Sequence, residues 1–327
     1  MGRSVGGSFF GSVGVLLSLT LGITRASAGT RVSELMVTAG DSISAGFLSN
    51  WRAQRIDQKS APDADESDFP PHPRYAIPWW RIRLGQALNH KYTLSWSSGF
   101  DLSSHYLRLK ADLAQSEPGV DLKIMNVAFS GAVVADLDRQ ADAILSAWRS
   151  RKYRNIPYLT LTIGANDTCA PWFEGGNPDS EIEAGIRGFF TKLAGIRQPK
   201  PIRVLVAAIP KIPDLGKPEI LHHWLTPKMT CEYRMRYRDH YCNSLIFWSN
   251  AEEYRKDVAI VEHKNDVIRN LLAELSRELP QFEFAFGESL YRKPITISVL
   301  SKDCFHPNPE GQTMISELLW ADQPWFP

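Results

Sequence analysis

Short apolar runs that alternate with helical patterns constrain the fold of this chain more than any other feature of its sequence. Most of the runs are nearly continuous in apolar residues, which is typical of a strand buried on both faces of a parallel sheet. Five such runs lie at 34–39, 122–127, 158–163, 202–209 and 282–286. Helical patterns cover 76–89, 103–116, 132–149, 180–196, 229–247, 263–278 and 309–320. The alternation predicts one parallel sheet with helices on both faces, whose ligands bind beyond the carboxyl ends of the strands.

Composition narrows the class of function. The chain has 327 residues, of which 43% are hydrophobic and 22% are charged, as in a soluble globular protein with a sizeable core. Its net charge of +1 creates no long-range field that would attract nucleic acid or a strongly acidic partner. We therefore expect no nucleic-acid partner, while the sequence leaves the oligomeric state open.

The first 28 residues differ from the rest of the chain. Arg3 is followed by an apolar stretch over 9–21, and the small residues at 26–28 fit the rule for signal peptidase. This pattern predicts a secretory signal cleaved after Ala28, which leaves 29–327 as a single domain outside the cytosol. The alternative is an uncleaved membrane anchor, but the apolar stretch is short for a span of about 20 residues.

Four cysteines stand at 169, 231, 242 and 304. An even count in a secreted chain predicts two disulfides, for which three pairings are possible. Cys231 with Cys242 would close a small loop, and Cys169 with Cys304 would tie together two loops that carry candidate site residues. The sequence does not choose among the pairings. Since no CxxC motif is present, the spacing does not indicate zinc, and we expect neither a metal nor another cofactor.

A charged, proline-containing segment at 50–74 breaks the alternation of strands and helices. It predicts an exposed loop insertion that walls or covers the site, or else a solvated insertion without a role.

The first candidate site motif is Gly40-Asp41-Ser42, directly after the predicted strand 34–39. Glycine permits a tight turn from strand to helix, Asp41 can accept hydrogen bonds from backbone amides, and Ser42 then lies at a helix N-terminus. The alternative interpretation is an ordinary Asp-Ser helix cap. A serine becomes a nucleophile only with a base beside it, and the base needs a group that orients it.

Three further motifs supply complementary groups. Ser130-Gly131 follows the strand 122–127, and glycine there lets a backbone N–H approach a ligand; a loop glycine that serves packing is the alternative. Gly164-Ala165-Asn166-Asp167 follows the strand 158–163. Its Asn166 is a neutral donor suited to a developing oxyanion, or else part of an Asx turn.

The fourth motif is Asp303-Cys304-Phe305-His306, in which the carboxylate can orient the imidazole and set its tautomer. We assign the remaining seven histidines to ordinary surface or packing positions.

The four motifs together resemble the SGNH, or GDSL, serine hydrolases over nearly all of the mature chain. The resemblance implies a flavodoxin-like three-layer α/β/α sandwich with a central, mainly parallel five-stranded sheet. It also implies that Ser42 is the nucleophile, His306 the base and Asp303 its orienting acid. The backbone amides of Ser42 and Gly131, together with the Asn166 side chain, would form the oxyanion hole. Asp41 and Gly164 would support the site.

A closer likeness is to the phospholipase B branch of that family. The segments that carry it are 94–101 (LSWSSGFD), 136–141 (DLDRQA), 166–169 (NDTC) and 303–306 (DCFH). The chain departs from the pattern of that branch at Phe100 and Ala165, where glycine is usual, and at Pro307, where phenylalanine is usual.

The sequence therefore predicts a secreted serine esterase or lipase that forms an acyl-enzyme on Ser42. A phospholipid or lysophospholipid acyl ester is the favoured substrate, and transient contact with a membrane surface would accompany it. Tryptophans 51, 79, 80 and 96 are candidates for lining an acyl pocket, although core positions are the commoner role of tryptophan. A carbohydrate O-acetylesterase and a non-catalytic binding protein on the same scaffold are the alternatives.

Overall fold

The computed structural model describes residues 32–47, 49, 93–150, 153–170 and 176–327. These residues form one compact unit. Four predictions lie outside them: the signal peptide, the loop insertion at 50–74, the helix at 76–89, and the roles of Trp51, Trp79 and Trp80. Within the described ranges, no helix combines the length and the apolar character needed to cross a membrane.

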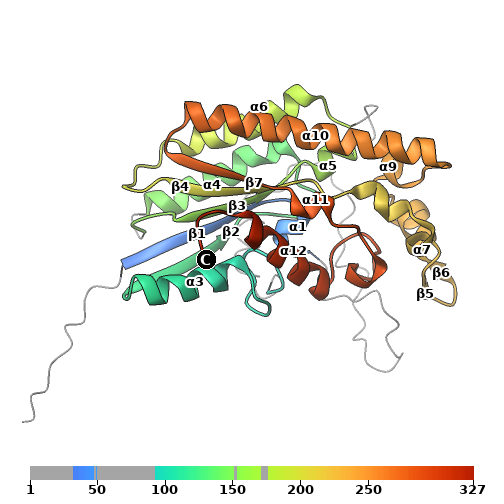
Figure 1. Cartoon of the computed structure of the whole chain (residues 1–327), viewed down its shortest axis with the longest axis horizontal. Helices are drawn as coiled ribbons and strands as arrows, with labels where there is room; N and C mark the ends of the chain where they lie inside the picture. The colour runs from blue at the N-terminus through green and yellow to red at the C-terminus, as the bar shows by residue number, and fades with distance from the viewer. Residues whose placement is uncertain (1–31, 48, 50–92, 151–152, 171–175) are drawn as a thin grey trace, which may run out of the picture. The chain divides into compact units, whose positions relative to one another are not determined.

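Five strands form one parallel sheet, and each was expected from its apolar run (Figure 1). They are β1 (Val32–Gly40), β2 (Val120–Asn126), β3 (Tyr158–Thr162), β4 (Ile202–Ala207) and β7 (Phe282–Gly287). Their order across the sheet is β2-β1-β3-β4-β7, and every neighbouring pair is parallel. The predicted α/β fold class is confirmed.

Strand β1 lies between β2 and β3. The chain therefore adds β2 on one side of β1 and then reverses direction to add β3 on the other side. Met36 pairs with Ile124 of β2, and Gly40 at the end of β1 pairs with Thr162 at the end of β3. This reversal of direction opens a crevice beyond the carboxyl ends of the strands, where open α/β sheets bind their ligands.

Helices cover both faces of the sheet (Figure 1). The long ones are α3 (His105–Ser116), α4 (Leu137–Arg149), α6 (Asp179–Leu193), α10 (Ala251–Glu278) and α12 (Pro309–Asp322). Helices α4, α6 and α10 pack on one face, and α3 and α12 pack on the other. Short helical turns precede or follow the strands at α1 (Ser42–Ala45), η3 (Val134–Asp136), α5 (Ala165–Thr168) and α11 (Ser289–Arg292).

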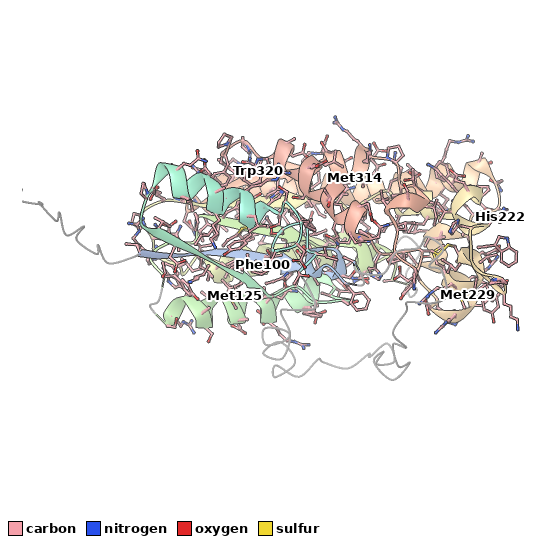
Figure 2. All side chains as sticks on the ribbon, turned by 90° about the horizontal axis from the view of Figure 1, so that it is seen from below. Phe100, Met125, His222, Met229, Met314 and Trp320 are labelled. Carbon is pink, nitrogen blue, oxygen red and sulfur yellow. A yellow bond between two sulfur atoms is a disulfide. The ribbon has the colours of Figure 1, made fainter. Side chains whose placement is uncertain are left out.

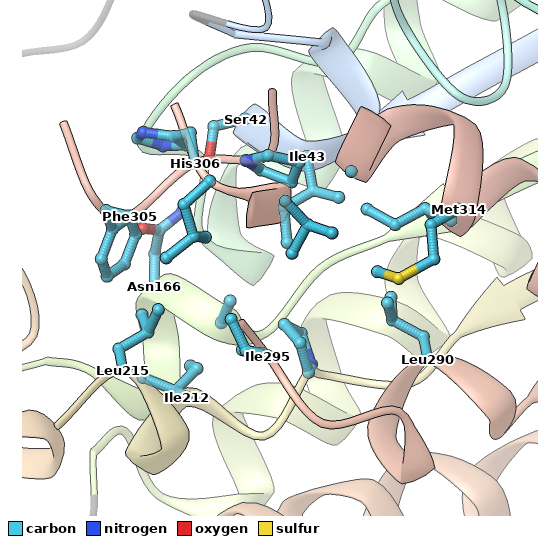
Figure 3. A pocket seen from close by; sticks show the side chains of 17 residues that line it. Ser42, Ile43, Asn166, Ile212, Leu215, Leu290, Ile295, Phe305, His306 and Met314 are labelled. Atoms are coloured by element: carbon cyan, nitrogen blue, oxygen red, sulfur yellow. The ribbon is translucent and has the colours of Figure 1, made fainter. Parts of the chain in front are cut away.

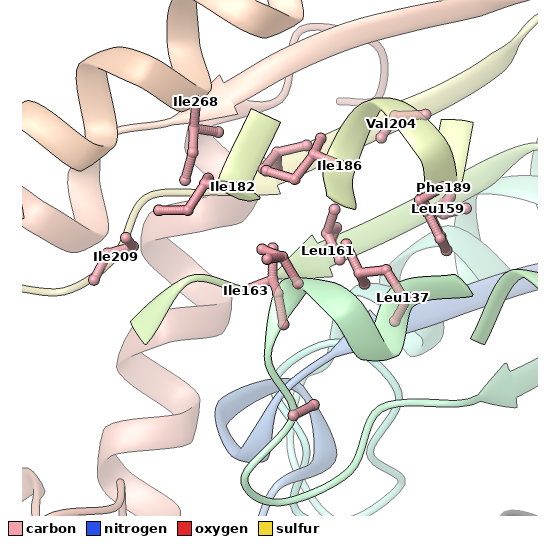
Figure 4. Close-up of a cluster of buried hydrophobic side chains, with 14 of the residues drawn as sticks. Leu137, Leu159, Leu161, Ile163, Ile182, Ile186, Phe189, Val204, Ile209 and Ile268 are labelled. Carbon is pink, nitrogen blue, oxygen red and sulfur yellow. The ribbon is translucent and has the colours of Figure 1, made fainter. Parts of the chain in front are cut away.

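The alternation of side chains along β1 divides the core between the two layers. Leu35 and Val37 belong to the cluster under α4, α6 and α10, whereas Met36 points to the cluster under α3 and α12. Figure 4 shows the first cluster, where Leu159 and Leu161 of β3 lie near residues of α4 and α6. Because both faces of the central strands β1, β3 and β4 are buried, their sequences are mostly apolar.

The predicted helix over 229–247 is wrong. The chain there forms a hairpin and three short turns: β5 (Trp224–Thr226), β6 (Met229–Thr230), α8 (Cys231–Tyr233), the π-helical η5 (Arg234–Arg238) and α9 (Asn243–Ile246). His240 and Cys242 have positive φ angles of 52° and 45°, which end a right-handed helix.

Helix α10 begins earlier than the expected residue 263. The side chain of Asn250 accepts hydrogen bonds from the amides of Glu252 and Glu253 and so caps a helix that starts at Ala251. The chain after β4 forms two short helical turns, η4 (Ile212–Gly216) and α7 (Pro218–Leu221).

Two disulfides are present, as expected, and they join Cys169 to Cys242 and Cys231 to Cys304. Both pairings singled out from the sequence are therefore wrong. The two cysteines of the segment that follows β6 are bonded to two different site loops instead of to each other.

Candidate active site

The turn after β1 depends on Gly40, which has a φ of 121°. A Cβ atom at this position would lie 2.0 Å from the carbonyl oxygen of Thr162, so no larger residue fits. The amide of Asp41 donates to the same oxygen at 2.9 Å. The turn therefore ends β1 sharply against β3 and starts α1 at Ser42, as the sequence predicted.

Asp41 caps this short helix through its Oδ1 atom, which accepts from the amide of Ile43 at 3.0 Å. Its Oδ2 atom is buried and has no hydrogen-bond partner among the described residues. Burial raises the pKa of Asp41 to about 7, against the hydrogen bond from Ile43 and the attraction of His306. The carboxyl group beside Ser42 is thus protonated in mildly acidic solution.

Gln140 of α4 is a site residue that the sequence analysis did not identify as one. Its Oε1 atom accepts from the amide of Gly40 at 2.7 Å, and its Nε2 atom donates to the carbonyl of Gly40 at 2.9 Å. The signal was present in the sequence: Gln140 stands in the apolar stripe of its helix, between Leu137 and Ile144, where a polar residue needs a buried partner.

The loop after β3 places Asn166 within α5, which starts after Gly164 with a φ of 100°. One N–H of the Asn166 side chain donates to the carbonyl of Ala132 at 2.8 Å, leaving the second N–H for a ligand. Gly131, next to Ala132, is exposed with a φ of 77°. This hydrogen bond joins the two loops that carry the predicted oxyanion-hole residues.

Asp303 is fully buried and surrounded by donors. Its Oδ1 atom accepts from the hydroxyl of Ser301 at 2.5 Å, from the amide of Phe305 at 3.1 Å and from the amide of His306 at 3.0 Å. Its Oδ2 atom lies 2.5 Å from Nδ1 of His306. Burial alone would raise the pKa of Asp303, but the charge and hydrogen bonds of His306 and the Ser301 hydroxyl lower it to about 2.

An ionised Asp303 accepts a proton-bearing Nδ1, and this fixes the tautomer of His306. Nε2 then remains as the basic nitrogen of the imidazole. The ring is held by aromatic contacts at its edges, with centroids of Phe47, Phe305 and Tyr241 at 5.0, 5.1 and 5.8 Å. These contacts and the hydrogen bond to Asp303 therefore hold the imidazole in one orientation.

Ser42, Asn166 and His306 line one pocket of about 670 Å³, a volume that includes space open to solvent. Figure 3 shows these three side chains grouped at one end of the pocket. Apart from them, the lining is apolar; the labelled apolar residues are Ile43, Ile212, Leu215, Leu290, Ile295, Phe305 and Met314. Three of the four sequence motifs thus contribute a side chain to a single pocket.

Two predicted residues do not line it. Gly131 is not among the lining residues, although the carbonyl of its neighbour Ala132 accepts a hydrogen bond from the side chain of Asn166, which does line the pocket. Trp96, a candidate for lining an acyl pocket, is instead fully buried in the core cluster under α3 and α12. It therefore has the commoner role of tryptophan, as a core residue. Most of the apolar lining comes instead from the loop after β4, from the chain between β7 and α12, and from α12 itself. Only Ala165 and Phe305 of the apolar lining belong to one of the four sequence motifs. Among the described residues, no group of histidine, cysteine, aspartate and glutamate side chains is arranged to hold a metal ion.

Ser42, Asn166 and His306 meet at one end of an apolar pocket on an α/β fold. Together with the family match, this arrangement defines the protein as a carboxylic ester hydrolase. The chain belongs to the GDSL-like lipase/acylhydrolase family, whose model matches residues 36–319. The family resemblance of the sequence is thereby confirmed. No curated protein matches the sequence.

The chain is also similar to several solved structures. One is LAE5, an alpha/beta hydrolase enzyme from the metagenome of Lake Arreo in Spain, with 16% identity, coverage of 90% of this chain and 97% of that chain, and a TM-score of 0.41. A variant of Axe2, an acetylxylan esterase from Geobacillus stearothermophilus, has 12% identity, coverage of 91% and 99%, and a TM-score of 0.45. The esterase EstA from Pseudoalteromonas sp. has 13% identity, coverage of 88% and 96%, and a TM-score of 0.36.

Proposed function

We propose that the protein hydrolyses lipid acyl esters through an acyl-enzyme on Ser42. His306 serves as the base, and Asp303 orients it. The Asn166 side chain and the backbone amides of Ser42 and Gly131 act as oxyanion donors. The observation that supports this most directly is the shared pocket, in which a serine, a histidine with a fixed tautomer and an amide donor meet an apolar wall.

In the first half of the reaction, Oγ of Ser42 attacks the ester carbonyl carbon while its proton passes to Nε2 of His306. Asp303 stabilises the imidazolium that forms, and the donors hold the negative oxygen of the tetrahedral intermediate. The bond to the alcohol oxygen then breaks, and His306 returns the proton to the leaving alcohol. In the second half, water attacks the acyl-enzyme with His306 again as the base, which releases the acid and restores Ser42.

The apolar lining favours a long acyl chain over acetate. Each buried CH₂ group of a ligand contributes about 0.8 kcal/mol. An acetyl group would leave most of the lining uncovered, including Leu290 and Met314, which lie away from Ser42 in Figure 3. A phospholipid or lysophospholipid ester supplies such a chain, and the two disulfides are in keeping with the proposed secretion of the protein.

Replacement of the nucleophile tests the chemistry. Ser42→Ala should abolish hydrolysis of p-nitrophenyl esters and labelling by a fluorophosphonate probe. Ser44→Ala is the matched control, because Ser44 lies in the same short helix and its buried hydroxyl has no partner within the described part of the chain. Full turnover by folded Ser42→Ala would rule out the mechanism, and absence of labelling in the wild-type protein would favour a binding protein.

A substrate panel tests the acyl preference. We expect faster release of long acyl chains from phosphatidylcholine and lysophosphatidylcholine than of acetate from acetylated xylan. The reverse order would identify a carbohydrate acetylesterase.

A further inference from the structure

We propose that residues 222–240, here called the aromatic-basic segment, dock the protein on an anionic phospholipid surface. The segment comprises the β5–β6 hairpin, α8 and η5, and it lies outside the central sheet (Figure 1). His222 and Met229 mark it at one end of the molecule in Figure 2. The proposal deepens the proposed function and rests on it, since it names how a lipid substrate is approached.

The segment exposes large aromatic side chains. Trp224, Tyr233 and Tyr237 are 59%, 52% and 60% exposed, and among the described residues the only other large hydrophobic side chain exposed to this degree is Phe100 at 50%. The rings of Tyr233 and Tyr237 lie 5.8 Å apart. Tryptophan and tyrosine, which combine an apolar ring with a polar tip, are the residues that gather at the boundary between lipid and water.

The most exposed charged side chains of the same segment are all positive. Its exposed charged side chains are Lys228, Arg236 and Arg238. Its two carboxylates, Glu232 and Asp239, are only 33% and 17% exposed, and each forms an ion pair with an arginine of the segment. Because the whole chain carries a net charge of only +1, this concentration of cations is local. A local patch of this sign fits the phosphate groups of a lipid surface.

Two disulfides connect the aromatic-basic segment and the residues just after it to the active-site loops. Cys231, within the segment, is bonded to Cys304, which lies two residues before His306. Cys242, just beyond it, is bonded to Cys169 in the loop that follows Asn166. These bonds hold the segment at a set position next to the catalytic groups.

Tyr241 provides a direct contact with the pocket. Its ring packs against the ring of Phe305, with centroids 4.7 Å apart, and Phe305 lines the pocket. A surface that binds the aromatic-basic segment would therefore lie beside the pocket, where a lipid chain can enter without crossing open water. The alternative partners of an aromatic and basic surface, such as an acidic protein, lack this connection with an apolar acyl pocket.

Co-sedimentation of the full chain with vesicles tests the proposal. Wild-type protein should bind vesicles of phosphatidylcholine mixed with phosphatidylglycerol more tightly than vesicles of phosphatidylcholine alone, and added salt should weaken the binding. The double variant Lys228→Gln, Arg238→Gln should lose about 25-fold in affinity for the mixed vesicles, since each cation near an anionic surface contributes about fivefold. The triple variant Trp224→Ser, Tyr233→Ser, Tyr237→Ser should weaken binding to both vesicle types.

Phe100→Ser is the matched control, because it removes an exposed aromatic ring outside the segment. It should bind vesicles as the wild-type protein does. The double, triple and Phe100→Ser variants should hydrolyse a soluble short-chain ester at the wild-type rate, which also verifies that they fold. Failure of the wild-type protein to bind either vesicle, or unchanged binding by both segment variants, would overturn the proposal. Ser42→Ala separates the two proposals, since loss of the catalytic serine should leave vesicle binding intact.

Discussion

The side chain of Gln140 occupies both backbone hydrogen-bonding groups of Gly40, although one hundred residues separate the two in the sequence. The carbonyl of Gly40 also accepts from the amide of Phe129, in the loop that leads to Gly131. Helix α4 thus fixes the turn that presents Ser42 and connects it with a second site loop. We infer that Gln140 is a positioning residue for the proposed nucleophile.

Gln140→Met should lower kcat with little change in KM, because the turn at Gly40 loses two hydrogen bonds and the substrate pocket is untouched. A stability loss of about 1–3 kcal/mol should accompany it. Gln198→Met is the control, since Gln198 binds both backbone groups of Ile156 in the same manner at the opposite end of β3. Steady-state kinetics and denaturant unfolding of both variants should give similar stability losses but lower kcat for Gln140→Met alone.

Asp303→Asn should reduce kcat by roughly 10²–10⁴, because an amide beside Nδ1 favours the tautomer whose Nε2 already carries a proton. Ser301→Ala removes one of several hydrogen bonds to Asp303 and leaves the tautomer of His306 unchanged, so its loss should stay below about tenfold. Kinetics with a soluble ester measures both. Wild-type turnover by Asp303→Asn would show that Asp303 does not orient the base.

The pH dependence of stability should reveal the buried carboxyl of Asp41. Its pKa is raised from 3.8 to about 7, so the folded state holds this proton more tightly than the unfolded state. The resulting stability is fully present below 3.8 and is lost as the pH rises toward 7. Burial likewise raises the pKa of Asp167 to about 6, which adds to the same slope.

Asp41→Asn keeps the helix cap but cannot ionise, so its unfolding free energy should fall less between mildly acidic and mildly alkaline pH. The difference from the wild-type protein over that range should be about 2 kcal/mol. Denaturant unfolding across the range measures it, and exposed Asp101→Asn should follow the wild-type profile. Parallel profiles for Asp41→Asn and the wild-type protein would contradict the assignment.

Met314 should limit the length of acyl chain that the pocket accepts. It projects from α12 into the pocket, away from Ser42 in Figure 3. Met314→Trp should lower kcat/KM for p-nitrophenyl decanoate by roughly tenfold, which corresponds to losing room for about two CH₂ groups. Hydrolysis of the acetate ester by the same variant is the internal control and should not change. An equal loss on both esters would mean that the substitution disturbs the site as a whole.

The sheet could be predicted from sequence because its signal is local. A strand buried on both faces is mostly apolar, as in the central strands β1, β3 and β4. The edge strands β2 and β7 kept enough of this pattern to be recognised, although they expose Lys123 and Glu283. Gly40 could also be recognised locally, because a glycine after an apolar run indicates a sharp turn, although the contact with Thr162 that excludes a side chain there is distant in sequence. Ser42 and Asn166 closely follow strands, and His306 lies in the loop before the last helix. The fold brings these three residues to one pocket.

Tertiary packing decided the rest, because the interactions involved join residues that are distant in sequence. The bonds from Cys231 to Cys304 and from Cys169 to Cys242 each span 73 residues, and spacing alone could not select them. The segment 229–247 has a helical pattern but is divided into short turns, with these two bonds at Cys231 and Cys242. The partner of Gln140 and the apolar wall around Met314 arise in the same way, from elements that meet only when the sheet is assembled. The sequence alone therefore determined which chemical groups follow the strands, and the folded chain determined what holds them and what lines the pocket beside them.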